Sequence, residues 1–349
     1  MEKLANVSFH AKIGSITQKM NRTAILANKL AEIVGLSEEE HAHLQRATQI
    51  YKFDLVSNMV SEFPELQGKM GEEYALLQGE NPAVATAIRE HYMPLSSDAA
   101  LPETKIGAVL AAADKLDSVI SFFIYDMIPT GSNDPYALRR QMIGIVDMID
   151  TYDRSFGSFD FYSFLKNALT AVYGIKEAAQ IEKVMTDLMV FVKARIQQRL
   201  QKKAISHDIQ ESILSSSENN LYLLLENATE LQSHHSDNDF KDIIEALSRV
   251  INIATKAETG FNIDVNLFET TSEKNLYVQI NHLDTIWDNA SIKEKYQALK
   301  ELEPYIIAYF DDNMVMVPDD AIRHNRLTML AKLAEKILSF ADVRKLINK

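Results

Sequence analysis

Apolar residues recur at three- and four-residue spacing along almost the whole chain, and this pattern limits the fold more than any other feature. In the segment 16–34 they form one stripe, which stops at Gly35. Such spacing is typical of an amphipathic α-helix that buries one face. No alternation of apolar and polar residues lasts long enough to predict a β-sheet. With 11 glycines and 8 prolines in 349 residues, the chain also offers few tight turns. We therefore predict an all-α fold.

Capping signals predict several helix boundaries. Ser37 precedes three glutamates and is a suitable N-cap, because the helix dipole favours acids in the first turn. Pro82 and Pro102 are expected at helix starts. A long final helix should be capped by Asp319 or Asp320.

The composition is that of a soluble globular protein, with 46% hydrophobic and 24% charged residues. A chain of 349 residues is too long for one ordinary core, so two or three domains are expected. No run of apolar residues could cross a bilayer, and the first residues lack the apolar core of a signal peptide. We therefore expect a cytoplasmic protein with no membrane partner. Cysteine is absent, which excludes disulfides, thiolate metal sites and a cysteine nucleophile.

Changes in local residue composition divide the chain into three segments. These are a helical domain at 1–155, a helical connector at 156–237 and a last domain at 238–349. The polar stretch 231–242 is the best linker candidate, and its adjacent His234 and His235 are expected at the surface. Within the last domain, 262–284 looks less regular, with a possible capping box at Thr271 that lacks its glutamate.

The connector carries a basic stripe. No acidic residue occurs from Leu188 to His207, while Arg195, Arg199 and Lys203 recur at four-residue spacing and should share a helix face. In a protein with a net charge of −13, this face is the clearest candidate for contact with phosphates. A solvated helix face is the alternative.

Asp54 raises the question of a metal site. It lies in QIYKFDLV (49–56), predicted to be a buried helix, where an unpaired carboxylate would be costly. A site of carboxylates and histidines on converging helices would draw on His41, His43, Asp54, His91, Asp114 and Asp117. The alternative is that the acids pair with lysine, arginine or backbone groups. No GxSxG, P-loop or GxGxxG motif occurs, and we predict no catalytic residue.

Long and specific strings occur at 53–75 (FDLVSNMVSEFPELQGKMGEEYA), 87–94 (AIREHYMP) and 113–140 (ADKLDSVISFFIYDMIPTGSNDPYALRR). They closely resemble the HD-like domain of the β subunit of bacterial glycyl-tRNA synthetase. The string YFDDNMVMVPDDAIRHNRLTMLAKL (309–333) is similar to the same subunit's anticodon-binding domain. That domain is of the DALR type shared with arginyl-tRNA synthetase, and its motif here reads Asp320-Ala321-Ile322-Arg323. The family's β subunit is longer, and this sequence resembles its C-terminal half.

The resemblance also bears on the metal question. HD phosphohydrolases hold metal with an early histidine, a His-Asp doublet and a distal aspartate. The corresponding residues here would be Arg22, the pair Phe53-Asp54, and Asp114. Arg22 and Phe53 cannot bind a metal ion, but a guanidinium can pair with a carboxylate. The resemblance therefore implies no metal, and a structural charge network of Asp54 and Asp114 with Arg22 or His91.

For function, the resemblance implies recognition of tRNA-Gly. The last domain would read the anticodon, and the HD-like domain would lie near the acceptor region. A separate α subunit, the partner in an α2β2 heterotetramer, would use ATP and Mg to form the glycyl-adenylate. This chain would then need no cofactor, bind no DNA and be non-catalytic alone, although it is part of a glycine–tRNA ligase.

Proteins read RNA loops by stacking on splayed bases and by hydrogen bonds to base edges. The resemblance to the DALR-type domain implies such a surface, formed by the first helix of the domain (Arg249, Asn252, Lys256) and the entry to its last helix (Asn313, Met314, Arg323, Arg326). Arg323 could equally pair with Asp319 or Asp320 at the helix start. From 239 to 349 the chain has 14 Lys and Arg against 18 Asp and Glu, a net charge of −4. RNA binding there would depend on a local patch.

Two other functions stay open at this point. A metal-dependent phosphohydrolase of HD type would need imidazole ligands that are missing at the expected positions. A non-catalytic helical scaffold for subunit assembly would bind the α subunit without affinity for tRNA.

Overall fold

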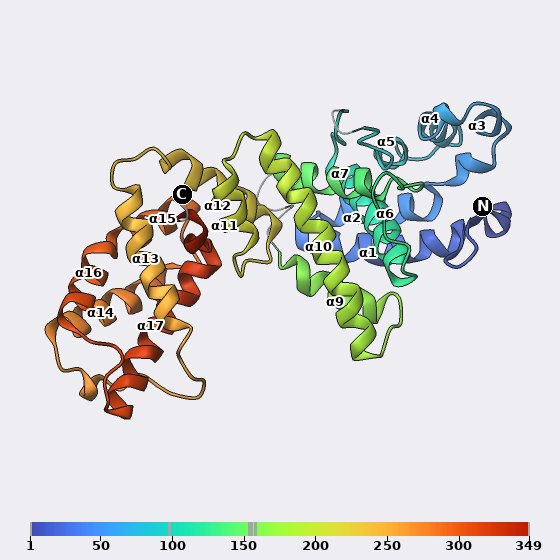
Figure 1. The fold of residues 1–349 in the computed structure, drawn as a ribbon. Coiled ribbons are helices and arrows are strands. Elements are labelled where there is room, and N and C mark those ends of the chain that lie inside the picture. The colour runs from blue at the N-terminus through green and yellow to red at the C-terminus, as the bar shows by residue number, and fades with distance from the viewer. Residues whose placement is uncertain (1, 97–98, 153–155, 157–158, 348–349) are drawn as a thin grey trace. The chain divides into compact units, whose positions relative to one another are not determined.

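The computed structural model describes residues 2–96, 99–152, 156 and 159–347. They are mostly helical (Figure 1), which confirms the all-α prediction. In the described residues the strands are limited to a short antiparallel hairpin, β1 (Ser8–His10) with β2 (Gly14–Ser15). The chain separates into two compact units. The first comprises residues up to 199 with 220–222, and the second comprises 200–219 with 223–349. The predicted division into three segments stays a prediction.

Helix α6 is the central helix of the first unit, and other helices pack around it. Its elements are η1 (Glu2–Asn6), α1 (Ile16–Val34), α2 (Glu38–Ile50), η2 (Phe53–Val56), α3 (Asn58–Glu62), η3 (Pro64–Leu66), α4 (Lys69–Leu77), α5 (Pro82–Glu90), α6 (Lys105–Ile124), α7 (Leu138–Thr151), α9 (Phe161–Ala171) and most of α10 (Ala178–Lys202). Every residue of α6 from Ile106 to Phe123 is buried. Helices α1, α2, α5 and α7 pack against it. Each large apolar side chain buried in this way stabilises the fold by about 1.5–3 kcal/mol.

Local sequence explains several boundaries in this unit. Ser37 caps α2 in a capping box with Glu40, and Pro82 opens α5, both as predicted. Gly35 ends α1 at a φ of 70°, a left-handed conformation that glycine adopts readily. Helix α6 begins at Lys105 instead of Pro102, because the Thr104 hydroxyl accepts the N–H of Gly107 and acts as the N-cap.

The prediction of a buried helix over 49–56 is wrong in its second half. Helix α2 ends at Ile50, and a 3-10 turn follows from Phe53 to Val56. The backbone leaves helical geometry at Lys52, with φ −112° and ψ 10°, and the next helix starts separately because the Ser57 hydroxyl accepts the N–H of Val60 and caps α3. An N-cap residue takes an extended backbone, here with φ −82° and ψ 147°, so α2 and α3 cannot form one continuous helix.

The second unit is a helical bundle in which α13 packs against α16 and α17, and α14 packs against both as well. Its elements are α11 (His207–Leu214), most of α12 (Leu221–His234), α13 (Phe240–Ala254), η4 (Val265–Leu267), α14 (Thr271–Ile286), α15 (Ile292–Glu301), α16 (Glu303–Asp312), α17 (Asp320–Phe340) and η5 (Val343–Leu346). The capping box of α14 uses Thr270 and Glu273, one residue earlier than the sequence suggested. None of the helices in the described part of the chain is long and apolar enough to cross a membrane.

The linker expected at 231–242 is largely helical, since α12 extends to His234. The His234 ring lies between Glu230 and Asp237 and stacks on Tyr296 with a centroid separation of 4.2 Å. His235 contacts Asp208 at 3.2 Å. Both imidazoles therefore take part in packing within the second unit.

Asp319 and Asp320 provide a test of the α17 boundary. The Asp319 carboxylate accepts the N–H of Ile322 at 3.1 Å, so Asp319→Ala should lower the free energy of unfolding by about 1 kcal/mol. Asp320 is exposed and pairs with Arg323, and its replacement by alanine should change stability by less than about 0.5 kcal/mol. Urea unfolding followed by circular dichroism measures both, and equal losses would contradict the capping role of Asp319.

Candidate functional site

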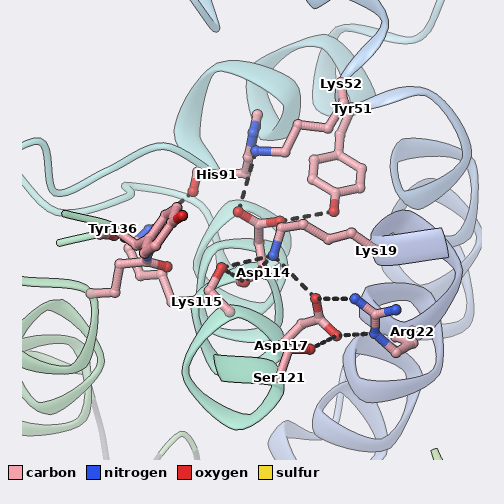
Figure 2. Close-up of polar contacts among 12 residues, drawn as sticks. Lys19, Arg22, Tyr51, Lys52, His91, Asp114, Lys115, Asp117, Ser121 and Tyr136 are labelled. Carbon is pink, nitrogen blue, oxygen red and sulfur yellow. Dashed lines mark hydrogen bonds and ion pairs between the residues drawn. The ribbon is translucent and has the colours of Figure 1, made fainter. Parts of the chain in front are cut away.

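In the first unit, two acids on α6 meet two cations on α1 (Figure 2). Lys19 and Arg22 are one turn apart on α1, and so are Asp114 and Asp117 on α6. The Lys19 ammonium lies 3.1 Å from Asp114 Oδ1 and 3.3 Å from Asp117 Oδ2. Arg22 donates to both carboxylate oxygens of Asp117, at 2.7 and 3.2 Å. The carboxylates are therefore neutralised by helix α1.

Asp114 has two further donors from the segment after α2. Tyr51 donates its hydroxyl to Asp114 Oδ1 at 2.9 Å, and Lys52 donates to Oδ2 at 3.3 Å. Burial alone would favour the neutral acid, but Lys19 and Lys52 hold the pKa of Asp114 well below its ordinary value. Because cations occupy both oxygens, a divalent metal could bind Asp114 only by displacing ammonium groups.

The expected charge network exists, but its membership differs from the expectation. Arg22 pairs with Asp117 instead of Asp54 or Asp114. Asp54 accepts the N–H of Gly68 at 2.8 Å, and burial raises the pKa of its carboxyl. Phe53 lies in a separate hollow with Arg46 and Glu80. A Cβ at Gly68 would lie 2.8 Å from the Tyr92 ring, and its φ of 79° also favours glycine.

His91 is fully buried and contacts the rings of Tyr51 and Tyr92. Its Nδ1 bonds to the carbonyl of Ile88, and its Nε2 has no hydrogen-bond partner among the described residues. Burial, reinforced by Lys52, lowers its pKa well below the usual range, so the ring is neutral. In the described ranges, no group of three or more histidine, aspartate or glutamate side chains could hold a metal ion. The absence of a bound metal stays a prediction.

Sequence reasoning missed Lys19, Tyr51 and Lys52. Lys19 carried a usable signal, because it lies on the same face of the 16–34 helix as Ile16 and Thr23, two residues of the stripe expected to be buried. A lysine on a buried face needs a counter-ion. The roles of Tyr51 and Lys52 depend on the turn after α2, which the sequence pattern did not predict.

Lys115, also on α6, is nearly inaccessible and donates one hydrogen bond to the His91 carbonyl at 3.0 Å. Burial lowers its pKa from 10.5 to about 7; Lys52, Lys19 and Arg140 add to this effect, and Asp114 opposes it.

In the second unit, most of the expected RNA-contacting residues surround one hollow of about 670 Å³. Arg249, Asn252 and Lys256 are exposed along one face at the end of α13. They face Phe310 and the segment 313–316, where Met314 is 72% exposed. The Arg249 guanidinium lies 4.1 Å from the centre of the Phe310 ring, a cation–π contact.

Arg326 is not on this surface, contrary to the sequence-based expectation. It is 3% exposed, and its guanidinium contacts Glu273 at 2.6 Å and Glu269 at 2.8 Å. It also donates to the Met314 carbonyl at 2.9 Å, which fixes the wall of the hollow. Burial raises the pKa of Glu273, but Arg326 and backbone N–H groups outweigh it and keep that pKa below its ordinary value.

Asn313 and Arg323 are likewise used within the protein. The Asn313 side chain donates to Ser272 and to the Tyr309 carbonyl, and it accepts from Thr270. Arg323 pairs with Asp320 and donates to the Val317 carbonyl at 2.9 Å, which is the alternative that the sequence left open.

The basic stripe is also partly used internally. Arg199 contacts Asp147 at 3.2 Å and Asp150 at 2.6 Å, both on α7. Arg195 is half-buried, with its guanidinium 5.2 Å from the Phe191 ring centre. Lys203 follows the end of α10 and is half-exposed. These contacts favour a packing role for Arg199 over a phosphate contact.

Two comparisons identify the relatives of this chain. The family model described as "Glycyl-tRNA synthetase beta subunit" matches residues 1–215, and "DALR anticodon binding domain" matches 243–341. The glycine–tRNA ligase β subunit of Lacticaseibacillus casei is 47% identical over 349 residues, which are 100% of this chain and 50% of the relative. That of Limosilactobacillus fermentum is 45% identical over 100% of this chain and 51% of the relative. The chain spans about half the length of the curated relatives it matches.

The pH dependence of stability should reveal the buried Lys115. Between pH 7 and 10.5 the unfolded chain keeps this proton while the folded protein has lost it. The free energy of unfolding should therefore rise with pH in this range. Lys115→Met removes the group, so its stability relative to the parent should fall as pH increases from 7 to 9. Denaturant unfolding at several pH values measures the difference, and parallel curves for the two proteins would contradict the assignment.

A second pair of variants separates structural from surface arginines. Arg326→Met leaves the buried Glu273 carboxylate without its cation and should cost about 3–5 kcal/mol of unfolding free energy. Arg323→Met breaks a pair with an exposed aspartate and should cost less than about 1 kcal/mol. Urea denaturation compares them, and a small loss for Arg326→Met would show that the guanidinium is not required in the core.

Proposed function

Because this chain belongs to the glycyl-tRNA synthetase β-subunit family, we propose that it binds tRNA-Gly as part of a glycine–tRNA ligase. A separate α subunit binds ATP, Mg and glycine, and the two kinds of subunit form an α2β2 heterotetramer in the cytoplasm. This chain contributes tRNA binding and no catalytic residue. The names of the relatives and the match to the anticodon-binding family support this proposal.

One observation carries the proposal: Arg249, Asn252, Lys256 and Met314, expected from sequence to contact RNA, line one hollow of the second unit. The hollow combines exposed cations with an aromatic ring and apolar side chains. Unstacked bases of RNA loops bind such surfaces by stacking and by hydrogen bonds to their edges. A volume of about 670 Å³ lies in the usual range of small-ligand pockets and has room for a nucleotide.

The residues divide naturally into two roles. Lys256 and Arg249 supply positive charge for phosphates, and the Phe310 ring with Met314 supplies a surface for a base. Asn252, Asp311 and Asp312 also line the hollow and offer donors and acceptors for base edges. The acids lower the net charge, so stacking and shape must carry much of the affinity. Arg326 acts indirectly, through its bond to the Met314 carbonyl.

The contacts of Asp114 do not favour the HD-type phosphohydrolase alternative. Lysine ammonium groups and the Tyr51 hydroxyl occupy the carboxylate that a metal would need. Nucleotide hydrolysis by the purified chain, lost with EDTA and with Asp54→Ala, would restore that alternative. A scaffold without tRNA affinity is the remaining rival, and the binding experiment decides between them.

The test is a titration of the whole chain with tRNA-Gly and with a tRNA-Gly of altered anticodon at two salt concentrations. The true anticodon should bind more tightly, and binding should weaken with salt. Lys256→Ala should weaken binding to both RNAs and lower the salt slope by about 1. Arg249→Ala should likewise weaken binding to both RNAs, about tenfold, because it removes the other cation that faces phosphates.

Lys241→Ala is the matched control. It removes one exposed lysine near the start of α13, the helix that ends just before Lys256, and this lysine lies outside the hollow. Its affinity should equal that of the parent. Loss of tRNA affinity in all three variants alike would point to bulk charge and against this hollow. Absence of any anticodon preference would favour the scaffold.

A further inference from the structure

A second hollow, of about 330 Å³, opens beside Asp114 in the first unit. Its basic lining residues are Lys19, Lys52, Lys115 and Arg140. Among the described residues that line it, Asp114 is the one carboxylate. The rings of Phe9, His91 and Tyr92 form other parts of the wall. Most of this charge is buried: Lys19 is 2%, Lys52 6% and Lys115 5% exposed.

The charges around the hollow do not cancel. Arg22 neutralises Asp117, and Lys19 neutralises Asp114. Lys52 and Arg140 then remain, together with Lys115, which carries its proton below about pH 7. The other acid close to this group is Asp54, whose charge acts on Lys52 and whose own pKa is raised by burial. The described part of the first unit thus encloses an excess of positive charge in a recess, where the low dielectric strengthens attraction for an anion.

Several donors on the wall are not used. The Lys52 ammonium makes one hydrogen bond, to Asp114, and lies 4.3 Å from the centre of the Tyr92 ring. The Lys115 ammonium donates one, to the His91 carbonyl. Each ammonium has three N–H groups. Within the described ranges, the exposed Arg140 side chain has no hydrogen bond or ion pair, and the buried Tyr92 hydroxyl has no partner.

We propose that this hollow binds the phosphate group of a small phosphate monoester, held by Lys52, Lys115 and Arg140. Both lysines and the guanidinium donate charge-assisted hydrogen bonds, and a guanidinium fits two oxygens of one phosphate. The volume lies at the lower end for ligand pockets and limits the occupant to about the size of a mononucleotide. This site is independent of the tRNA hollow in the second unit.

Calorimetric titration of the whole chain at pH 6 and low ionic strength, without tRNA, tests the proposal, because Lys115 then carries its proton. The probes are inorganic phosphate and AMP, with adenosine as the uncharged control. Phosphate and AMP should bind, and adenosine should not. Arg140→Gln should weaken both about tenfold or more, because one charge-assisted contact is lost. Lys115→Met should weaken them similarly, with folding checked by circular dichroism.

Arg139→Gln is the matched control, since it removes a neighbouring positive charge from the same helix but does not line the hollow. Its affinity for phosphate should stay within about twofold of the parent. The proposal is overturned if neither phosphate nor AMP binds, if adenosine binds as tightly as AMP, or if both arginine variants weaken binding equally. It is also overturned if Arg140→Gln weakens tRNA-Gly binding while phosphate and AMP do not bind, which would indicate contact with an RNA backbone.

Discussion

The ammonium group of Lys19, placed between two carboxylates of α6, is the interaction on which the first unit depends. A buried ion pair adds little net stability, because desolvation offsets most of the attraction. What it does fix is the alignment of helices. Lys19 and Arg22 are spaced one turn apart, as are Asp114 and Asp117, so only one axial placement of α1 on α6 satisfies all four charges. Any slip of one helix along the other would leave a buried charge unpaired, which is far more costly than a lost apolar contact.

The second unit follows the same principle with different helices. Arg326 on α17 bonds to Glu273 on α14 and to the carbonyl of Met314 in the segment before α17. Asn313 joins Thr270 and Ser272 to that segment. Asn313 and Arg326, which the sequence led us to expect on an RNA surface, therefore hold the loop that carries Met314. On the proposed function, the exposed residues of α13 would contact RNA, while these buried side chains support the neighbouring loop.

Features governed by near neighbours could be predicted from sequence. The Ser37 and Asp319 caps, the stop at Gly35 and the apolar face of α1 depend on residues within one turn. Contacts between distant segments could not. Arg326 looks like an exposed basic residue of a helix start, and its burial follows from Glu273, 53 positions earlier. The break after Ile50 occurs at Lys52, whose backbone leaves helical geometry, and helical periodicity cannot detect it. For the second unit, the family resemblance supplied the choice of Arg249, Asn252 and Lys256, and geometry placed them together.

The contact between Arg249 and Phe310 also affects how a base would bind to the ring and leave it. In the free protein the guanidinium already covers one face of the ring. A base that takes this face must first move the arginine aside, so the net gain is the difference between two stacking interactions. This exchange lowers the equilibrium affinity for the base but keeps the Phe310 ring covered while no RNA is bound. On the proposed function, the arginine returns as the base leaves, and this shortens the residence time of the bound RNA.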